Sequence, residues 1–179
     1  MSHKTHQSCN VLLELKCGGL LLDRHEPPFT RRFVVYFRTA LYTYAPVLRA
    51  LATLGRGNPA DSVERLEFAR PYELAVNGLN FPNFNLGGLH SAYVRGEALI
   101  AAHRYAEAAA EFQKILNHRG IVGMDPIGAL AHWRLGRTYT LSGDKAKAKS
   151  AYDAFLALWK HADPEIPILK QAKAEYSKL

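Results

Sequence analysis

The chain has 179 residues, a length typical of one domain, with 48% hydrophobic and 22% charged residues. This composition excludes a wholly disordered chain and a membrane protein. The formal net charge of +7 is spread thinly, so it favours binding to an acidic surface only weakly. Two cysteines, Cys9 and Cys17, are too few for a disulfide framework and favour a reducing compartment, the cytoplasm.

The first 40 residues lack the helical pattern found further along the chain, and we expect them to form an irregular head, either disordered or divergent. The apolar run 11–22 contains Glu14 and Lys16, so it does not resemble a signal peptide. The apolar stretch 33–54 contains two arginines and a proline, which makes it costly to place in a bilayer. We therefore predict no membrane partner.

Two groups of side chains in the head have residue types that could carry chemistry. Potential zinc ligands are His3, His6, Cys9 and Cys17. Structural zinc sites usually have two closely spaced ligand pairs separated by a loop, and this array does not, so we predict no metal. Arg31 and Arg32 lie beside aromatic residues, but one arginine pair does not provide the several phosphate contacts of a nucleic-acid surface. We therefore predict no nucleic-acid partner.

Helices are expected from residue 45 onward, because apolar residues recur at three- and four-residue spacing between short stretches rich in glycine, proline, aspartate and asparagine. The predicted helices are 45–54, 59–70, 89–102, 105–117, 126–141, 145–160 and 167–178. Asn58 and Asp125 each precede a proline and mark helix starts, since a capping side chain before proline is typical there. The segment 71–88 is predicted to be mainly an irregular loop.

A period of 40 residues relates two of the expected helix pairs. Tyr93, Gly96, Leu99, Ala108, Phe112 and Leu116 recur as Trp133, Gly136, Tyr139, Ala148, Tyr152 and Leu156. Glycine within a helix costs about 1 kcal/mol relative to alanine. Such a cost suggests close approach of a second helix, and we expect each glycine to face the alanine of its own hairpin. A fainter copy covers 45–70, with its turn 46 residues before the next.

The ends of the expected helices differ in how clearly they are marked. Gly143 is suited to the left-handed conformation of a helix end, whereas the corresponding turn at His103-Arg104 is less typical. His118-Arg119-Gly120 is predicted to cap the helix 105–117, with the glycine in the capping position. The last helix, 167–178, has no partner copy and is expected to cover the open end of the stack.

The repeated pattern resembles the tetratricopeptide repeat. The residues that carry this resemblance are Leu135, Gly136, Tyr139, Gly143, Ala148 and Tyr152. The earlier copy matches less fully, because Arg95 replaces the leucine before the glycine. Residues 44–179 are more specifically similar to the C-terminal repeats of bacterial multidomain serine/threonine protein kinases or winged-helix regulators. The resemblance implies an all-α fold over 41–179, an α-solenoid of tetratricopeptide-like helix hairpins with a C-terminal capping helix.

The sequence contains no recognisable active site. A protein kinase needs a glycine-rich loop, a strand lysine and the catalytic and metal-binding loops, and none of these motifs is present. The eight histidines are scattered, and none has a nucleophile or metal ligand at a suitable spacing. We therefore predict a protein that is not an enzyme, with no catalytic residue and no cofactor.

The resemblance implies instead that the first helix of each pair lines a concave face that binds a protein or peptide. The residues at the groove positions are His90, Tyr93, Glu97, Ile100, Leu130, Trp133, Arg137 and Thr140. Aromatic and arginine side chains on such a face are common anchors for a partner. Tyr93 and Trp133 have a second interpretation, in which they pack between helices. The alternative function is a C-terminal regulatory or sensory fragment of a bacterial serine/threonine protein kinase or transcriptional regulator.

Overall fold

A computed structural model describes residues 40–74 and 89–179, which fall within one compact unit, Arg38–Leu179. The residues predicted to form the head, with the histidine–cysteine array and the arginine pair, lie outside the described residues apart from Ala40. The same holds for most of the predicted loop 71–88. Throughout the described part of the chain, the regular secondary structure is helical, which confirms the all-α class there.

All seven predicted helices are present, and their ends lie within three residues of the predicted ones. In chain order, the elements are the π-helix η1 (Ala40–Tyr44), α3 (Ala45–Gly55), α4 (Pro59–Glu67), the 3-10 helix η2 (Arg70–Tyr72), α5 (Leu89–Ala101), α6 (Tyr105–Asn117), α7 (Arg119–Val122), α8 (Ile127–Leu141), α9 (Lys145–Leu158) and α10 (Pro167–Tyr176). The three short elements η1, η2 and α7 were not expected. They are too short to show a clear periodicity in the sequence.

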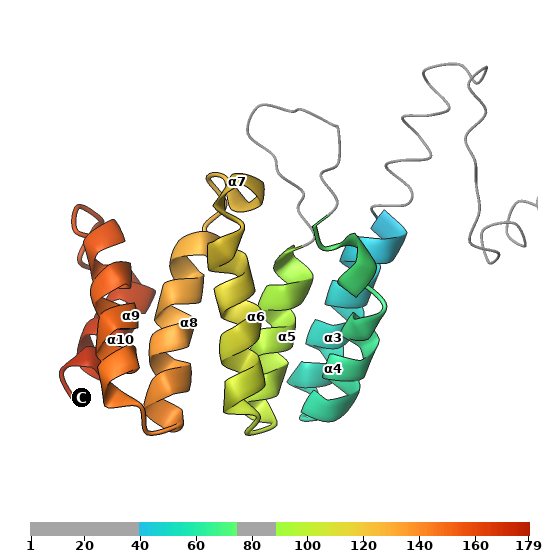
Figure 1. Cartoon of the computed structure of the whole chain (residues 1–179), viewed down its shortest axis with the longest axis horizontal. Helices are drawn as coiled ribbons and strands as arrows, with labels where there is room; N and C mark the ends of the chain where they lie inside the picture. Colours follow the sequence, from blue (N-terminus) through green and yellow to red (C-terminus); the bar gives the residue numbers. More distant parts are fainter. Residues whose placement is uncertain (1–39, 75–88) are drawn as a thin grey trace, which may run out of the picture. The chain divides into compact units, whose positions relative to one another are not determined.

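The helices pack as hairpins. α3 packs on α4, α5 on α6, and α8 on α9, each pair joined by a short turn. Successive hairpins contact one another through α4 and α5 and through α6 and α8, and the first helices α3, α5 and α8 also touch in sequence (Figure 1). α10 follows and packs against α9.

The three hairpin turns have the same backbone hydrogen bonds. Gly57, His103 and Gly143 have φ angles of 77°, 58° and 84°, in the left-handed region. The next residue donates its amide to the carbonyl five positions back, at 2.9 Å both from Arg104 to Leu99 and from Asp144 to Tyr139. This Schellman arrangement pairs carbonyl groups that the end of a helix leaves unsatisfied. The atypical His103 turn therefore has the same geometry as the glycine turns.

The mid-helix glycines approach an aromatic ring of the second helix, and not the alanine that we predicted. A Cβ at Gly96 would lie 2.5 Å from Cζ of Phe112, and one at Gly136 would lie 2.7 Å from Cδ2 of Tyr152. The alanines one helical turn earlier, Ala108 among them, are fully buried nearby. The glycine is required because the flat ring occupies the space of its missing side chain.

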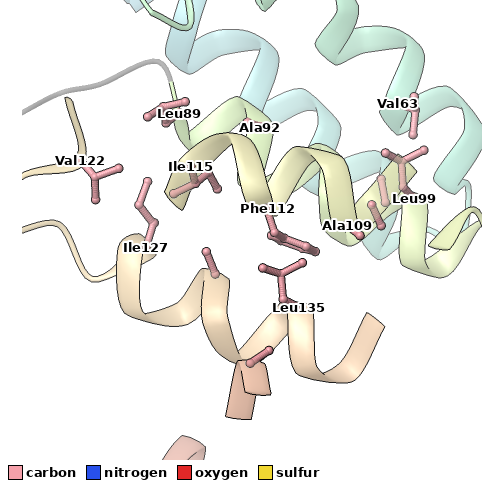
Figure 2. Close-up of a cluster of buried hydrophobic side chains, with 14 residues drawn as sticks. Val63, Leu89, Ala92, Leu99, Ala109, Phe112, Ile115, Val122, Ile127 and Leu135 are labelled. Atoms are coloured by element: carbon pink, nitrogen blue, oxygen red, sulfur yellow. The ribbon is translucent and has the colours of Figure 1, made fainter. Parts of the chain in front are cut away.

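The buried side chains form clusters that continue from one hairpin to the next. In the largest cluster, Phe112 of α6 lies against Leu135 of α8, while Val122 of α7 and Ile127 of α8 lie near Ile115 (Figure 2). A second cluster joins α8, α9 and α10 through Trp133, Tyr152, Phe155, Leu169 and Ala172. α10 thus covers aromatic residues of the last hairpin.

The end of α6 differs from the prediction. His118 follows α6 as its C-cap, and its Nδ1 lies 2.7 Å from the carbonyl oxygen of Lys114. Gly120, however, lies inside α7, and the left-handed glycine is Gly123, with φ of 56°. The reason is that the chain forms one more turn after Asn117, which moves the position that needs glycine to the end of α7.

Candidate interaction surface

The aromatic and acidic groove residues of α5 are used in contacts with α8. The ring of Tyr93 packs edge-on against Phe112 at a centroid distance of 5.6 Å, and its hydroxyl accepts a hydrogen bond from Nε of Arg134 at 3.3 Å. Glu97 Oε1 lies 2.6 Å from the same Arg134 nitrogen. Burial raises the pKa of Glu97 above its usual value, and Arg134 offsets this only in part.

The other two groove residues of α5 are half-buried. His90 Nε2 lies 3.3 Å from Oδ2 of Asp125, the residue that precedes α8. Ile100 packs against the largest buried cluster. Both residues therefore take part in contacts inside the molecule and retain only part of their surface for a partner.

The groove residues of α8 divide into covered and accessible ones. Trp133 is 4% exposed, and its Nε1 donates to Glu175 of α10 at 2.9 Å. Arg137 Nε lies 3.2 Å from the other oxygen of Glu175, with its guanidinium half-buried. Leu130 packs against the buried cluster that contains Trp133, whereas Thr140 is exposed. Trp133 thus follows the second interpretation, packing between helices.

Two residues that sequence reasoning missed, Arg134 and Glu175, organise these contacts. Arg134 of α8 pairs with Glu97 and bonds Tyr93 of the preceding hairpin. Glu175 of α10 pairs with Arg137 and bonds Trp133, which occupy the corresponding positions 40 residues later. The two bridging residues are 41 positions apart. Extending the 40-residue period into the last helix would have indicated this relation.

A buried charged cluster lies between α4, η2, α5 and α6, and it was also missed. Arg95 and Glu73 are fully buried and form an ion pair. Arg95 Nη1 donates to Glu111 Oε2 at 2.9 Å, and its Nη2 also donates to the carbonyl oxygen of Leu66 at 3.1 Å. Lys114 pairs with the second oxygen of Glu73. Arg95 is the residue that replaces the leucine of the repeat pattern, so this substitution introduces a buried ion network.

The charged cluster is better suited to holding helices together than to catalysis. Burial alone would raise the pKa of Glu73, but hydrogen bonds from Arg95 and Lys114 outweigh burial and hold the pKa below its usual value. Glu73 is therefore an anion at neutral pH with both carboxylate oxygens occupied. Perturbed buried carboxylates are common in active sites, but a fully paired one has no oxygen left for a substrate.

Comparisons with known proteins add no relative: no family model, curated protein or solved structure matches the chain. Within residues 40–74 and 89–179, no cluster of three or more histidine, cysteine or acidic side chains is arranged to hold a metal ion. Among the same residues, every helix is too short or too polar to cross a bilayer.

Proposed function

We propose that the protein is a non-catalytic scaffold, a tetratricopeptide-like α-solenoid that binds a protein or peptide on the face formed by α3, α5 and α8. The observation that carries the proposal is that successive hairpins share their internal contacts. The same turn recurs in all three hairpins, and the second and third hairpins also share a glycine against an aromatic ring and a bridge to the following first or last helix. Stacked hairpins of this kind create an extended surface, which such proteins use for binding.

We define the first-helix face by the groove positions that keep accessible surface. From the predicted groove residues we take His90, Arg137 and Thr140, and we add Leu51 of α3, which was not among those predicted. Leu51 is 45% exposed and lies 46 residues before Glu97, so it occupies the corresponding position of the first hairpin. The face thus combines an exposed apolar side chain on α3 with polar side chains on α5 and α8. This mixture suits an amphipathic peptide segment better than a purely apolar one.

The distribution of charge favours an acidic peptide at the C-terminal part of the described residues. Residues 119–179 contain ten basic and six acidic residues, whereas 40–74 and 89–118 each contain equal numbers of both. The excess positive charge of the described residues therefore lies within 119–179. The two arginines of α8 are paired with Glu97 and Glu175, and the other basic residues after α7 are lysines that follow α8. Complementary charge raises the association rate and helps to select the partner.

The proposal can be tested with peptides selected from a random phage-display library against the full chain. The test variant is Thr140→Glu, on the first-helix face, whose negative charge would also repel an acidic peptide, and the matched control is Ser150→Glu, at an exposed position of α9. A bulky side chain at residue 140 should obstruct the peptide and weaken binding by about tenfold or more, as measured by isothermal titration calorimetry. The control should bind like the wild-type protein.

Two results would contradict the proposed function. Equal affinities for both variants and the wild-type protein would place the peptide on another surface. Equal losses in both variants would show that added charge, and not position, determines binding. Circular dichroism of each variant checks that helical content is unchanged, and both substituted side chains are exposed, so neither should affect folding.

A further inference from the structure

A pocket of about 440 Å³ lies between the end of α6, α7, the start of α8 and the end of α9. Its walls are largely apolar and include Leu116, Val122, Met124 and Leu158. Its volume is within the range of small-molecule sites, which typically combine apolar walls with a few polar groups.

Apolar surface is exposed at the pocket. Met124 is 82% exposed and Leu158 is 56% exposed, although both are large apolar residues. Single exposed apolar side chains are normal, but two on one pocket, next to the buried Val122, form a surface that a bound apolar group would remove from water.

Two nitrogen-bearing side chains also line the pocket, Arg119 of α7 and His132 of α8. Within the described part of the chain, neither has a hydrogen-bond or ion-pair partner for its side chain. Asp125 is the acidic residue of the lining, and its oxygens are already engaged by the amide of Ile127 at 3.0 Å and by His90 at 3.3 Å. The donors that remain for a ligand are therefore cationic or neutral, and they suit an anion.

The pKa of His132 reflects both its burial and the positive charge in the pocket. Burial lowers the pKa of His132, and the positive charge of Arg119 lowers it further. At neutral pH the imidazole is uncharged and carries one N–H donor, while Arg119 keeps its charge. The positive charge of Arg119 disfavours the protonated form of His132. An anion bound between the two side chains would stabilise that form and raise the pKa of His132, so this pKa reports whether the pocket is occupied.

We propose that this pocket binds a small organic carboxylate with an apolar body, the carboxylate on Arg119 beside His132 and the body against Leu116, Met124 and Leu158. A guanidinium matches the planar geometry of a carboxylate and holds it with paired hydrogen bonds. The apolar walls select for the body of the ligand. The lining contains none of the four residues that define the first-helix face, so this proposal does not rest on the proposed scaffold function.

The test uses octanoate as the probe and 1-octanol as its uncharged counterpart, both titrated into the full chain and followed by calorimetry. We expect octanoate to bind the wild-type protein and to bind Arg119→Gln roughly tenfold more weakly, because a charge-assisted bond is lost. Octanol should bind more weakly than octanoate and should not distinguish the two proteins. Lys173→Gln, on the exposed side of α10, is the matched control and should retain the wild-type affinity.

A second variant and a second measurement keep the test decisive. Leu158→Glu places a negative charge at the exposed edge of the pocket, where it should not disturb folding but should weaken octanoate binding at least tenfold. In the wild-type protein, octanoate should raise the pKa of His132, followed by NMR of the imidazole protons. The proposal is overturned if octanoate does not bind, if octanol binds equally well, or if binding is insensitive to both substitutions.

Discussion

Gly96 and Gly136 hold the helices of their hairpins at a short distance because an aromatic ring occupies the place of a side chain. Alanine is intrinsically better in a helix than glycine by about 1 kcal/mol, so propensity alone would favour replacing both glycines. Packing opposes the replacement, because the Cβ of an alanine would lie 2.5 Å from the ring of Phe112 or 2.7 Å from the ring of Tyr152. Both rings are buried and cannot move without disturbing their neighbours.

We expect Gly96→Ala and Gly136→Ala each to lower the free energy of unfolding by about 1–3 kcal/mol, the usual cost of overpacking a core. Urea denaturation followed by circular dichroism measures this change. Gly120→Ala is the control, because no atom lies within 4 Å of a Cβ at that helical position. A higher free energy of unfolding in Gly96→Ala or Gly136→Ala would show that the aromatic ring can move away from the added methyl group.

His103 is the single non-glycine residue with a positive φ in the described part of the chain. It occupies the position of Gly57 and Gly143 in the other two turns, where glycine adopts this conformation without strain. We expect His103→Gly to raise the free energy of unfolding by about 0.5–1 kcal/mol, because the strain of the side chain is removed. The opposite change, Gly143→Ala, should lower it, and chemical denaturation of both variants checks the pair. Loss of stability in His103→Gly would instead show that the contact of His103 with Tyr105 outweighs the strain.

At the level of elements, one carboxylate of α10 contacts three side chains of the last hairpin, in addition to the apolar contacts that Leu169 and Ala172 make there. Glu175 accepts hydrogen bonds from Trp133 at 2.9 Å and from the hydroxyl of Tyr152 at 3.0 Å. It also pairs with Arg137 at 3.2 Å. Burial and the negative charge of Glu175 together raise the pKa of Tyr152, so the tyrosine stays protonated and remains a donor.

We expect Glu175→Ala to lower the free energy of unfolding by about 1–3 kcal/mol, because the buried donors of Trp133 and Tyr152 lose their acceptor. Hydrogen exchange of the α10 amides should accelerate, and the tryptophan emission should shift to longer wavelength as Trp133 becomes more exposed. Glu175→Gln keeps an acceptor and should recover part of the loss. Glu165→Ala, at an exposed ion pair with Lys170, should change stability by less than about 1 kcal/mol. Unchanged α10 exchange in Glu175→Ala would mean that apolar contacts alone hold this helix.

For the whole molecule, the ion network around Arg95 connects segments on both sides of residues 75–88. Glu73 lies near the end of the first described segment, and its partners Arg95 and Lys114 lie in the second. Removing one member of a buried ion pair is costly because the remaining charge has no compensation. The network therefore joins the first hairpin to the second in addition to their apolar contacts.

We expect Glu73→Gln to lower the free energy of unfolding by about 3–5 kcal/mol at pH 7, the usual cost of breaking a buried pair. The effect should depend on pH. The folded-state pKa of Glu73 is below its unfolded value, so the stabilising contribution is complete above the unfolded pKa and is lost as the pH falls through the folded pKa. The difference from the wild-type protein should therefore shrink in acid, as measured by denaturation between pH 7 and pH 2. Glu64→Gln, at an exposed residue of α4, should show neither change.

Much of the helical structure follows from local sequence. Apolar spacing and the predicted capping residue Asn58 locate helices, since a helix and its ends depend on residues within about four positions of each other. Asp125 was also predicted to cap a helix, but α8 begins one residue later, with Pro126 at the N-cap position. The period of 40 residues indicated which glycine and which aromatic position correspond, although not that they touch. Gly120 was misassigned because a single additional turn, α7, cannot be recognised from so few residues.

The amino-acid sequence by itself determined where the helices lie and which positions recur, because these properties are encoded in neighbouring residues. Only the tertiary structure decided that Trp133 is covered, that Glu175 bridges to it from 42 residues away, and that Arg95 is a buried cation and not an exposed one. Periodicity tells which side of a helix is buried but not what lies against it. The choice between an accessible anchor and a buried contact depends on helices that are distant in the chain.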